Sequence, residues 1–157
     1  MVSTVPQKLD LYFDDISEEQ VFVTSTRTVS EADVMMFAGL TGDYNELHTS
    51  RTYAEKTAFG QRIAHGMLIL SIANGLYMRM GYFNRSTVAN LGIEEWRFRK
   101  VVLLNDTLYV RIALKDKRMT SDGKRGVVHW NVEVLNQNDE VVASGVWSKM
   151  ISQEKAV

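Results

Sequence analysis

Two of the three histidines of this chain, His48 and His65, lie in one segment, residues 37–73, together with Asp43. Asp43 and His48 are five positions apart, and in a loop this spacing lets a carboxylate and an imidazole reach the same water molecule. Histidine suits proton transfer because its unperturbed pKa lies near neutrality. Proton transfer to or from water requires a positioned acid–base pair of this kind. We therefore predict that Asp43 and His48 activate a water molecule.

A second chemical feature lies at Gly66, at the start of a long apolar segment. The N-terminus of a helix presents unpaired N–H groups and the positive end of the helix dipole. Glycine has no Cβ, so a substrate carbonyl can approach the backbone closely. Together these properties predict a site that stabilises an oxyanion.

Each of these residues also has a purely structural interpretation. Asp43 could close an Asx turn within Thr-Gly-Asp-Tyr-Asn, and His48 could be an exposed loop histidine. We interpret His65 as a residue that shapes the entry to the helix rather than one that transfers protons. Asp43, His48 and His65 are also of the types that bind metals. No HExxH or comparable spacing supports a metal site, so none is predicted.

The composition excludes several classes of protein. Lys and Arg number 18 and Asp and Glu number 19, for a formal net charge of -1, without the excess of basic residues typical of non-specific nucleic-acid binders. The absence of cysteine excludes disulfides, thiolate zinc sites, iron–sulfur clusters and a cysteine nucleophile. The hydrophobic share of 45% and the charged share of 24% are those of a globular protein. We expect one domain over residues 1–157, with its core at about 21–150.

The apolar segment at residues 67–82 is interrupted by polar residues and is shorter than the about 20 apolar residues that span a bilayer. We interpret it as a buried helix and expect no membrane association. The first ten residues lack the basic and apolar regions of a secretion signal. The expected location is therefore the cytoplasm.

Local patterns predict the elements that position the site. Residues 21–29 are rich in β-branched side chains and predict a strand. Ser30 has the features of an N-cap, with acidic residues in the turn that follows, and Thr41-Gly42-Asp43 ends this helix. We expect a short helix over 50–56 and a long one over 67–80. Residues 1–20 carry several acidic side chains and are expected to lie on the surface.

After residue 95 the apolar period changes to two, which predicts consecutive antiparallel strands. A sheet with one apolar face needs a cover, and a helix that is apolar on most sides needs surrounding structure. We therefore predict an α+β fold in which an antiparallel sheet curls around the helix at 67–80. The alternating positions are Trp96 and Phe98; Leu108, Val110, Ile112 and Leu114; Val128, Trp130, Val132 and Val134; and the strand at 142–151.

The chemical residues form a joint pattern that resembles a known family. It resembles the MaoC-like, or (R)-specific enoyl-CoA hydratase, family of hot-dog-fold proteins. The hydratase motif reads roughly Gly-Asp-x-Asn-Pro-x-His, then a segment with Phe, then Ile-(Ala/Val)-His-Gly-Met-Leu. The resemblance covers about residues 21–150, and its fold agrees with the predicted one. The matching positions are Gly42, Asp43, Asn45, His48, Phe59, Ile63, Ala64, His65, Gly66, Met67 and Leu68.

The resemblance implies hydration of a trans-2-enoyl thioester to an (R)-3-hydroxyacyl thioester, or the reverse dehydration, in fatty acid metabolism. It implies that Asp43 and His48 hold the water, that the Gly66 N–H holds the thioester oxygen and that Asn45 buttresses the loop. No cofactor is expected, because the CoA or acyl-carrier thioester is itself the substrate. Further substrate-binding residues are then Ala64, His65, Met67 and Asn74.

Two positions depart from the family pattern. Glu46 stands where the motif has proline, and Asn74 stands where several hydratases have serine. Both changes bear on the size and shape of the substrate. Arg97, Arg99 and Lys100 are consistent either with contacts to CoA phosphates or with a solvated strand face.

Two other functions are compatible with the fold. A hot-dog thioesterase would hydrolyse the thioester, but it usually needs an acidic residue on the central helix, and residues 67–80 contain none. A non-catalytic acyl-thioester binder would not need the Asp43–His48 pair. A homodimer or higher homo-oligomer is expected, because a curled sheet leaves an open edge and the family places its site near a subunit interface.

Overall fold

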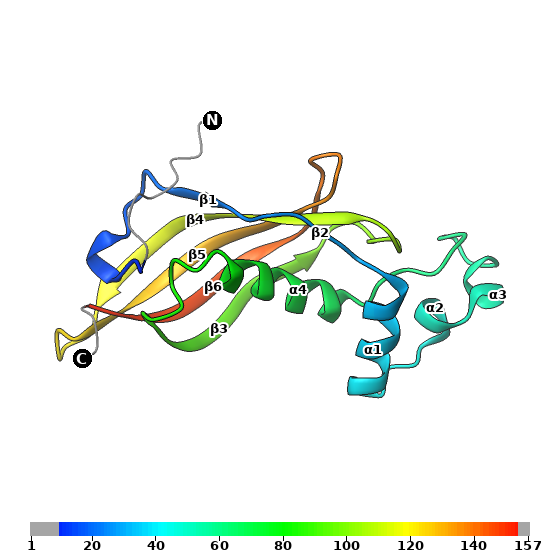
Figure 1. Cartoon of the computed structure of the whole chain (residues 1–157), viewed down its shortest axis with the longest axis horizontal. Helices are drawn as coiled ribbons and strands as arrows, with labels where there is room; N and C mark the ends of the chain where they lie inside the picture. The colour runs from blue at the N-terminus through cyan, green and yellow to red at the C-terminus, as the bar shows by residue number, and fades with distance from the viewer. Residues whose placement is uncertain (1–9, 154–157) are drawn as a thin grey trace.

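The computed structural model describes residues 10–153 of the chain. Four long antiparallel strands and one long helix make up most of it (Figure 1). The strands are β3 (Thr87–Phe98), β4 (Thr107–Met119), β5 (Arg125–Leu135) and β6 (Val141–Ser152). The sheet order is β1-β4-β5-β6-β3, with β1 (Val21–Val23) at one edge and β3 at the other.

The helix α4 (Gly66–Arg79) lies along the concave face of this sheet (Figure 1). Leu68, Ile69, Ile72, Ala73, Leu76 and Tyr77 are buried. They pack against alternate residues of the strands, including Trp130 at 0% exposure. The predicted hot-dog arrangement, an antiparallel sheet wrapped around a central helix, is confirmed.

The sheet covers α4 on one side more than on the other. Met67 is 57% exposed and Leu70 is only partly buried. Because Leu68, Ile69 and Ile72 of the same two turns are buried, the prediction that surrounding structure covers most of this helix is wrong only for the face that carries Met67 and Leu70.

The predicted strand at 21–29 is divided into β1 and β2 (Arg27–Thr28), which both pair with β4. Val23 is opposite Arg111, whereas Arg27 is opposite Leu108, so the first segment has one residue more than β4 between these pairs. Thr24 lies in the gap, and its hydroxyl accepts a hydrogen bond from the Val110 N–H. This extra residue forms a bulge, which a periodicity argument cannot locate.

The surface position expected for residues 1–20 is wrong for residues 11–13 and 16, which are buried, whereas Asp14 and residues 17–19 are exposed; residues 1–9 lie outside the described part. Leu11, Phe13 and Ile16 are buried in the core beside the short 3₁₀ helix η1 (Phe13–Asp15). A Cβ on Gly126 would come within 2.0 Å of the Phe13 ring, so β5 needs a glycine there. The acidic residues of this segment suggested an exposed position, although apolar residues lie between them.

Three further helices lie at the end of the sheet where α4 begins (Figure 1). They are α1 (Glu31–Thr41), α2 (Glu46–Thr49) and α3 (Arg51–Ala54). The Ser30 hydroxyl caps α1 as predicted, in a capping box with Asp33, and Gly42 ends it in the left-handed conformation at φ 79°. The expected short helix at 50–56 is α3, whereas α2 was not predicted. No helix within residues 10–153 has the length and hydrophobicity needed to cross a membrane.

Candidate active site

Asp43 follows the glycine that ends α1, and its side chain organises the next turn. Its Oδ1 accepts a hydrogen bond from the Asn45 N–H at 3.3 Å. The Asn45 carboxamide oxygen accepts in turn from the Leu47 N–H and caps α2. The Asx turn considered from the sequence is present, and it leaves most of the Asp43 carboxylate exposed. Through these two hydrogen bonds Asn45 connects Asp43 to the start of α2.

His48 belongs to α2 and is held by one backbone hydrogen bond. Its Nδ1 lies 2.8 Å from the carbonyl oxygen of Ile63. A carbonyl only accepts, so Nδ1 carries the proton. In neutral His48 the other nitrogen, Nε2, therefore has a free lone pair. This tautomer is the one that can accept a proton from a water molecule.

His65 is buried at 2% exposure and fixes the two residues just described. Its Nε2 donates to the backbone oxygen of Asp43 at 2.9 Å. Its ring lies 3.8 Å from the His48 ring, with an interplanar angle of 32°, and 5.1 Å from the Phe37 ring. His65 was expected to shape the entry to the helix; it is the N-cap residue of α4, but its side chain makes no capping hydrogen bond and instead contacts Asp43 and His48.

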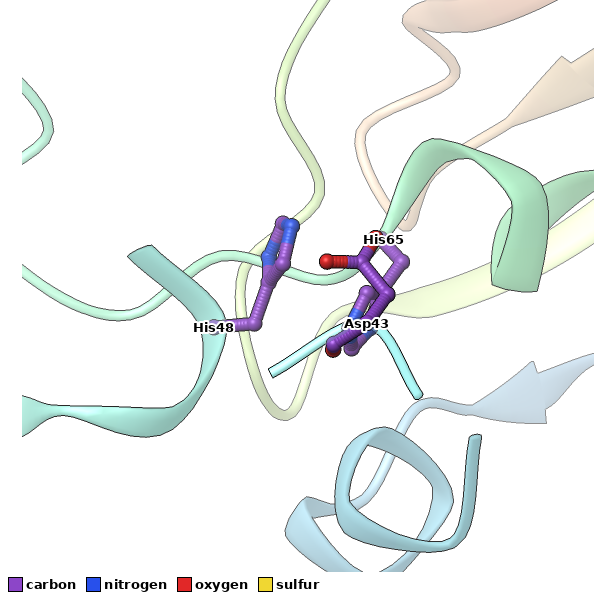
Figure 2. Close-up of side chains that lie close together, drawn as sticks. All are labelled: Asp43, His48 and His65. Atoms are coloured by element: carbon purple, nitrogen blue, oxygen red, sulfur yellow. The ribbon is translucent and has the colours of Figure 1, made fainter. Parts of the chain in front are cut away.

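The three side chains converge on one point (Figure 2). Asp43, His48 and His65 each offer one possible metal-ligand atom, a carboxylate oxygen or a ring nitrogen, and these three atoms lie within 4.8 Å of one another. The Asp43 carboxylate points toward the His48 ring (Figure 2), and no direct hydrogen bond joins the two side chains. A water molecule between them could bond to both. The same spacing is compatible with a divalent cation, so a test for metal dependence belongs with any assay of activity.

A cavity of about 290 Å³ adjoins this cluster and is lined by His48, Ala64 and Gly66, among others. Gly66 is the first residue of α4, so its N–H is one of the helix donors without a partner inside the helix. A Cβ on Gly66 would lie 2.9 Å from the Phe98 ring, a separation that real Cβ atoms do not show. A larger residue at this position would require the exposed Phe98 ring to move, whereas glycine leaves room for both the ring and a ligand oxygen.

Not all the candidate residues lie at this cavity. Met67 is exposed and Asn74 lines a different cavity, where it contacts Lys149. Arg99 and Lys100 line the cavity beside His48, whereas Arg97 does not. Lys149 was missed because it was counted only as part of an apolar strand. Its charge between Trp147 and Ile151 was the signal that could have revealed it.

The chain belongs to the MaoC-like family, because the model of the "MaoC like domain" matches residues 15–137. Protein MaoC of Klebsiella aerogenes is 35% identical over 123 residues, which are 76% of this chain and 36% of that protein. The chain thus spans little more than a third of that curated relative. The family resemblance seen in the sequence is confirmed.

Solved structures agree with this assignment. The monoamine oxidase regulatory protein from Archaeoglobus fulgidus has a TM-score of 0.87 and 35% identity, over 96% of this chain and 99% of that one. Unliganded R-hydratase PhaJ1 from Pseudomonas aeruginosa has a TM-score of 0.77 and 27% identity, over 94% of this chain and 89% of that one. The hot-dog fold and the MaoC-like family are therefore established for this chain.

Proposed function

We propose that this protein adds water to a trans-2-enoyl-CoA to give an (R)-3-hydroxyacyl-CoA, or catalyses the reverse dehydration. The observation that carries the proposal is the convergence of Asp43 with His48, together with the cavity that His48 and Gly66, the first residue of α4, line. The name of the R-hydratase among its structural neighbours supports the same reaction and the same stereochemistry.

In this mechanism a water molecule bonds to the Asp43 carboxylate and to Nε2 of His48. The water oxygen forms a bond to C3 of the substrate while one of its protons passes to the Asp43–His48 pair. The electron pair of the C2=C3 bond moves toward the thioester carbonyl. The Gly66 N–H and the helix dipole stabilise the negative charge on that oxygen. The pair then returns a proton to C2, which restores the starting state of the protein.

In this proposal Arg99 and Lys100, which line the same cavity as His48, bind the phosphates of CoA. The Arg99 Nε donates to the Ser144 hydroxyl at 2.7 Å, and the Lys100 ammonium pairs with Glu140. Both cations therefore approach the cavity from fixed positions. The proposed substrate needs no further cofactor, because the thioester supplies the activated carbonyl.

A single assay tests the reaction class. Purified protein is incubated with crotonyl-CoA, and loss of the enoyl absorbance and release of free thiol are followed in parallel. The proposal predicts loss of absorbance without thiol, and chiral analysis should give the (R) product. Thiol release would instead indicate a thioesterase, although α4 carries no carboxylate for that reaction. If neither loss of absorbance nor thiol release is seen, the protein is a non-catalytic binder.

The same assay tests for a metal. The proposed mechanism predicts unchanged turnover after EDTA treatment and dialysis. Loss of activity that zinc restores would show that Asp43, His48 and His65 bind a cation, and it would overturn the water-activating roles proposed above.

A further inference from the structure

Lys149 lies on β6 in an environment built for an apolar residue. It faces the same side of the strand as Trp147 and Ile151, which both belong to the hydrophobic core. The whole residue is 2% exposed. Lysine is almost never buried to this extent unless it is paired with an acidic group.

The partners of the Lys149 ammonium are all neutral. Its Nζ donates to the Asn90 Oδ1 at 2.5 Å and to the Asn74 Oδ1 at 3.3 Å. It also lies 4.5 Å from the Tyr77 ring centroid and 5.3 Å from that of Trp147. Burial lowers the pKa of Lys149 to about 8. At neutral pH most molecules therefore carry a buried positive charge with no negative partner among the described residues.

This ammonium lies at the wall of the larger cavity, of about 570 Å³, between α4 and strands β3 and β6. Apart from Lys149, its lining is neutral and includes Leu70, Leu91, Ile93 and Trp147. No acidic residue lines it. Ser148, the neighbour of Lys149, donates to Glu94, which lies outside the lining.

The cavity lies farther along the helix that begins at the candidate oxyanion site. Gly66, Leu70 and Asn74 are spaced four residues apart and so share one face of α4. Eight residues at 1.5 Å each separate Gly66 from Asn74 by about 12 Å. An acyl chain whose thioester oxygen bonds to Gly66 and which follows this face therefore leads toward Lys149.

We propose that Lys149 binds a carboxylate at the far end of the acyl chain, so that the substrate is a dicarboxylic 2-enoyl thioester. This inference rests on the proposed function for the position of the thioester. Asn74 and Asn90 orient the ammonium, and the third N–H of Lys149 is available for the substrate carboxylate. A carboxylate would supply the missing negative charge, whereas a methyl terminus would leave the ammonium uncompensated in an apolar cavity.

The separation limits the chain length. A hydrogen bond at each end takes up about 3 Å, which leaves roughly 6 Å for the chain. This remaining distance separates the thioester oxygen from the carboxylate oxygen. An extended chain advances about 3.5 Å in three bonds, so about five bonds join the two oxygen atoms and pass through four carbon atoms. A four-carbon dicarboxylic acyl group fits this span.

The test compares matched ligands that differ only at the far end. Binding of the unreactive succinyl-CoA and butyryl-CoA is measured by titration calorimetry with wild type, Lys149→Met and Lys149→Gln. Lys115→Met removes the same charge from an exposed position of β4 and is the matched control. Thermal unfolding of each variant shows that it is folded. Hydration of fumaryl-CoA and crotonyl-CoA is measured separately.

Wild type and Lys115→Met should bind succinyl-CoA about 10- to 100-fold more tightly than butyryl-CoA, the range typical of a charged hydrogen bond. Both Lys149 variants should lose this preference. Equal binding of the two ligands by wild type, or a preference that survives in Lys149→Met, would overturn the inference. If binding shows the preference but neither enoyl-CoA is hydrated, the proposed reaction fails and the carboxylate site stands.

Discussion

At the scale of single residues, the site is set by hydrogen bonds from side chains to the backbone. The Ile63 carbonyl selects the tautomer of His48, and the Asp43 carbonyl selects that of His65. Neither interaction involves the groups proposed to hold the water. The backbone therefore fixes the chemistry of the loop before any ligand is present.

Replacing the proposed acid–base pair should abolish turnover without unfolding the protein. Asp43→Asn keeps the shape but removes the negative charge, and His48→Ala removes the second partner of the water. Each should reduce kcat about 10²–10⁴-fold, the usual contribution of a positioned acid–base group. Because both groups act on one water, the double variant should be little worse than the poorer single variant. Steady-state kinetics with crotonyl-CoA measure both effects.

Thermal unfolding gives the control for this series. Asp43 is exposed and His48 is only partly buried, so the melting temperature should change little. Turnover near the wild-type rate in the folded double variant would show that the site is wrong. Unfolding of the variants would favour the structural interpretation of the loop.

Gly66 offers a test that separates packing from catalysis. Gly66→Ala places a methyl group against the Phe98 ring, and it also narrows the approach to the Gly66 N–H. Both stability and kcat should fall. Adding Phe98→Ala to Gly66→Ala should remove the clash. The melting temperature of this double variant should therefore equal that of Phe98→Ala alone. The rate should stay low in the double variant, since the methyl group still blocks the substrate oxygen. Recovery of both would mean that Gly66 matters only for packing.

The buried charge of Lys149 predicts an unusual dependence of stability on pH. Burial lowers its native pKa to about 8, below the value of about 10.4 for an unfolded chain. Between these values the unfolded state binds more protons, so stability rises with pH. Relative to Lys149→Met, the free energy of unfolding of wild type should increase by about 1–2 kcal/mol from pH 7 to pH 9.5. Urea titrations at both values measure it, and a constant difference would show that burial does not lower the pKa of Lys149.

At the scale of elements, the short helix α2 determines where His48 lies. It has only four residues, too few for an apolar period, and this is why the sequence indicated a loop there. Its start is nevertheless encoded by the Asn45 cap and by acidic Glu46 in the first turn. The longer elements were predictable because the apolar residues of the helices repeat every 3.6 positions over three or more turns, and those of the strands repeat every two positions over several repeats.

Most residues of the candidate site could be predicted from the sequence because they are close together in the chain. Asp43, His48, His65 and Gly66 all lie within 24 positions of the chain, so local structure alone can bring them together. Lys149 reaches Asn74 across 75 positions through the pairing of distant elements. Such a contact requires the register of the sheet, which no local pattern specifies.

The prediction of a single domain stays a prediction.

The family proline can be restored to test the preorganisation of α2. Glu46 is the first residue of the helix, a position where proline is favoured because its N–H has no partner. Asn45 has ψ 134°, which suits a residue that precedes proline. Glu46→Pro should therefore raise the free energy of unfolding by about 0.4–1 kcal/mol with kcat retained. Urea unfolding and crotonyl-CoA hydration measure the two quantities, and Glu46→Ala controls for the lost charge. Destabilisation beyond that of Glu46→Ala would mean that the loop does not have this conformation.

At the scale of the whole molecule, the two edges of the sheet differ. One edge consists of β1 and β2, which have three and two residues, and such short strands discourage pairing with another chain. The other edge is β3, with 12 residues, and its Val88, Leu91 and Ile93 are 47–50% exposed. A long apolar edge is a site at which a second chain can pair. It also borders the cavity that holds Lys149, so a partner at this edge would adjoin the proposed acyl site.

We therefore predict a homodimer joined through β3. Sedimentation equilibrium should give a mass of about 36 kDa, twice the 17.9 kDa of the chain. Lysines on an edge strand oppose pairing, so the double variant Val88→Lys, Leu91→Lys should sediment near 18 kDa. Met119→Lys is the matched control, because Met119 is exposed at 39% on β4, an interior strand. It should leave the dimer intact. A wild-type mass near 18 kDa under assay conditions would contradict the prediction, and a dimer that survives in the double variant would place the interface elsewhere.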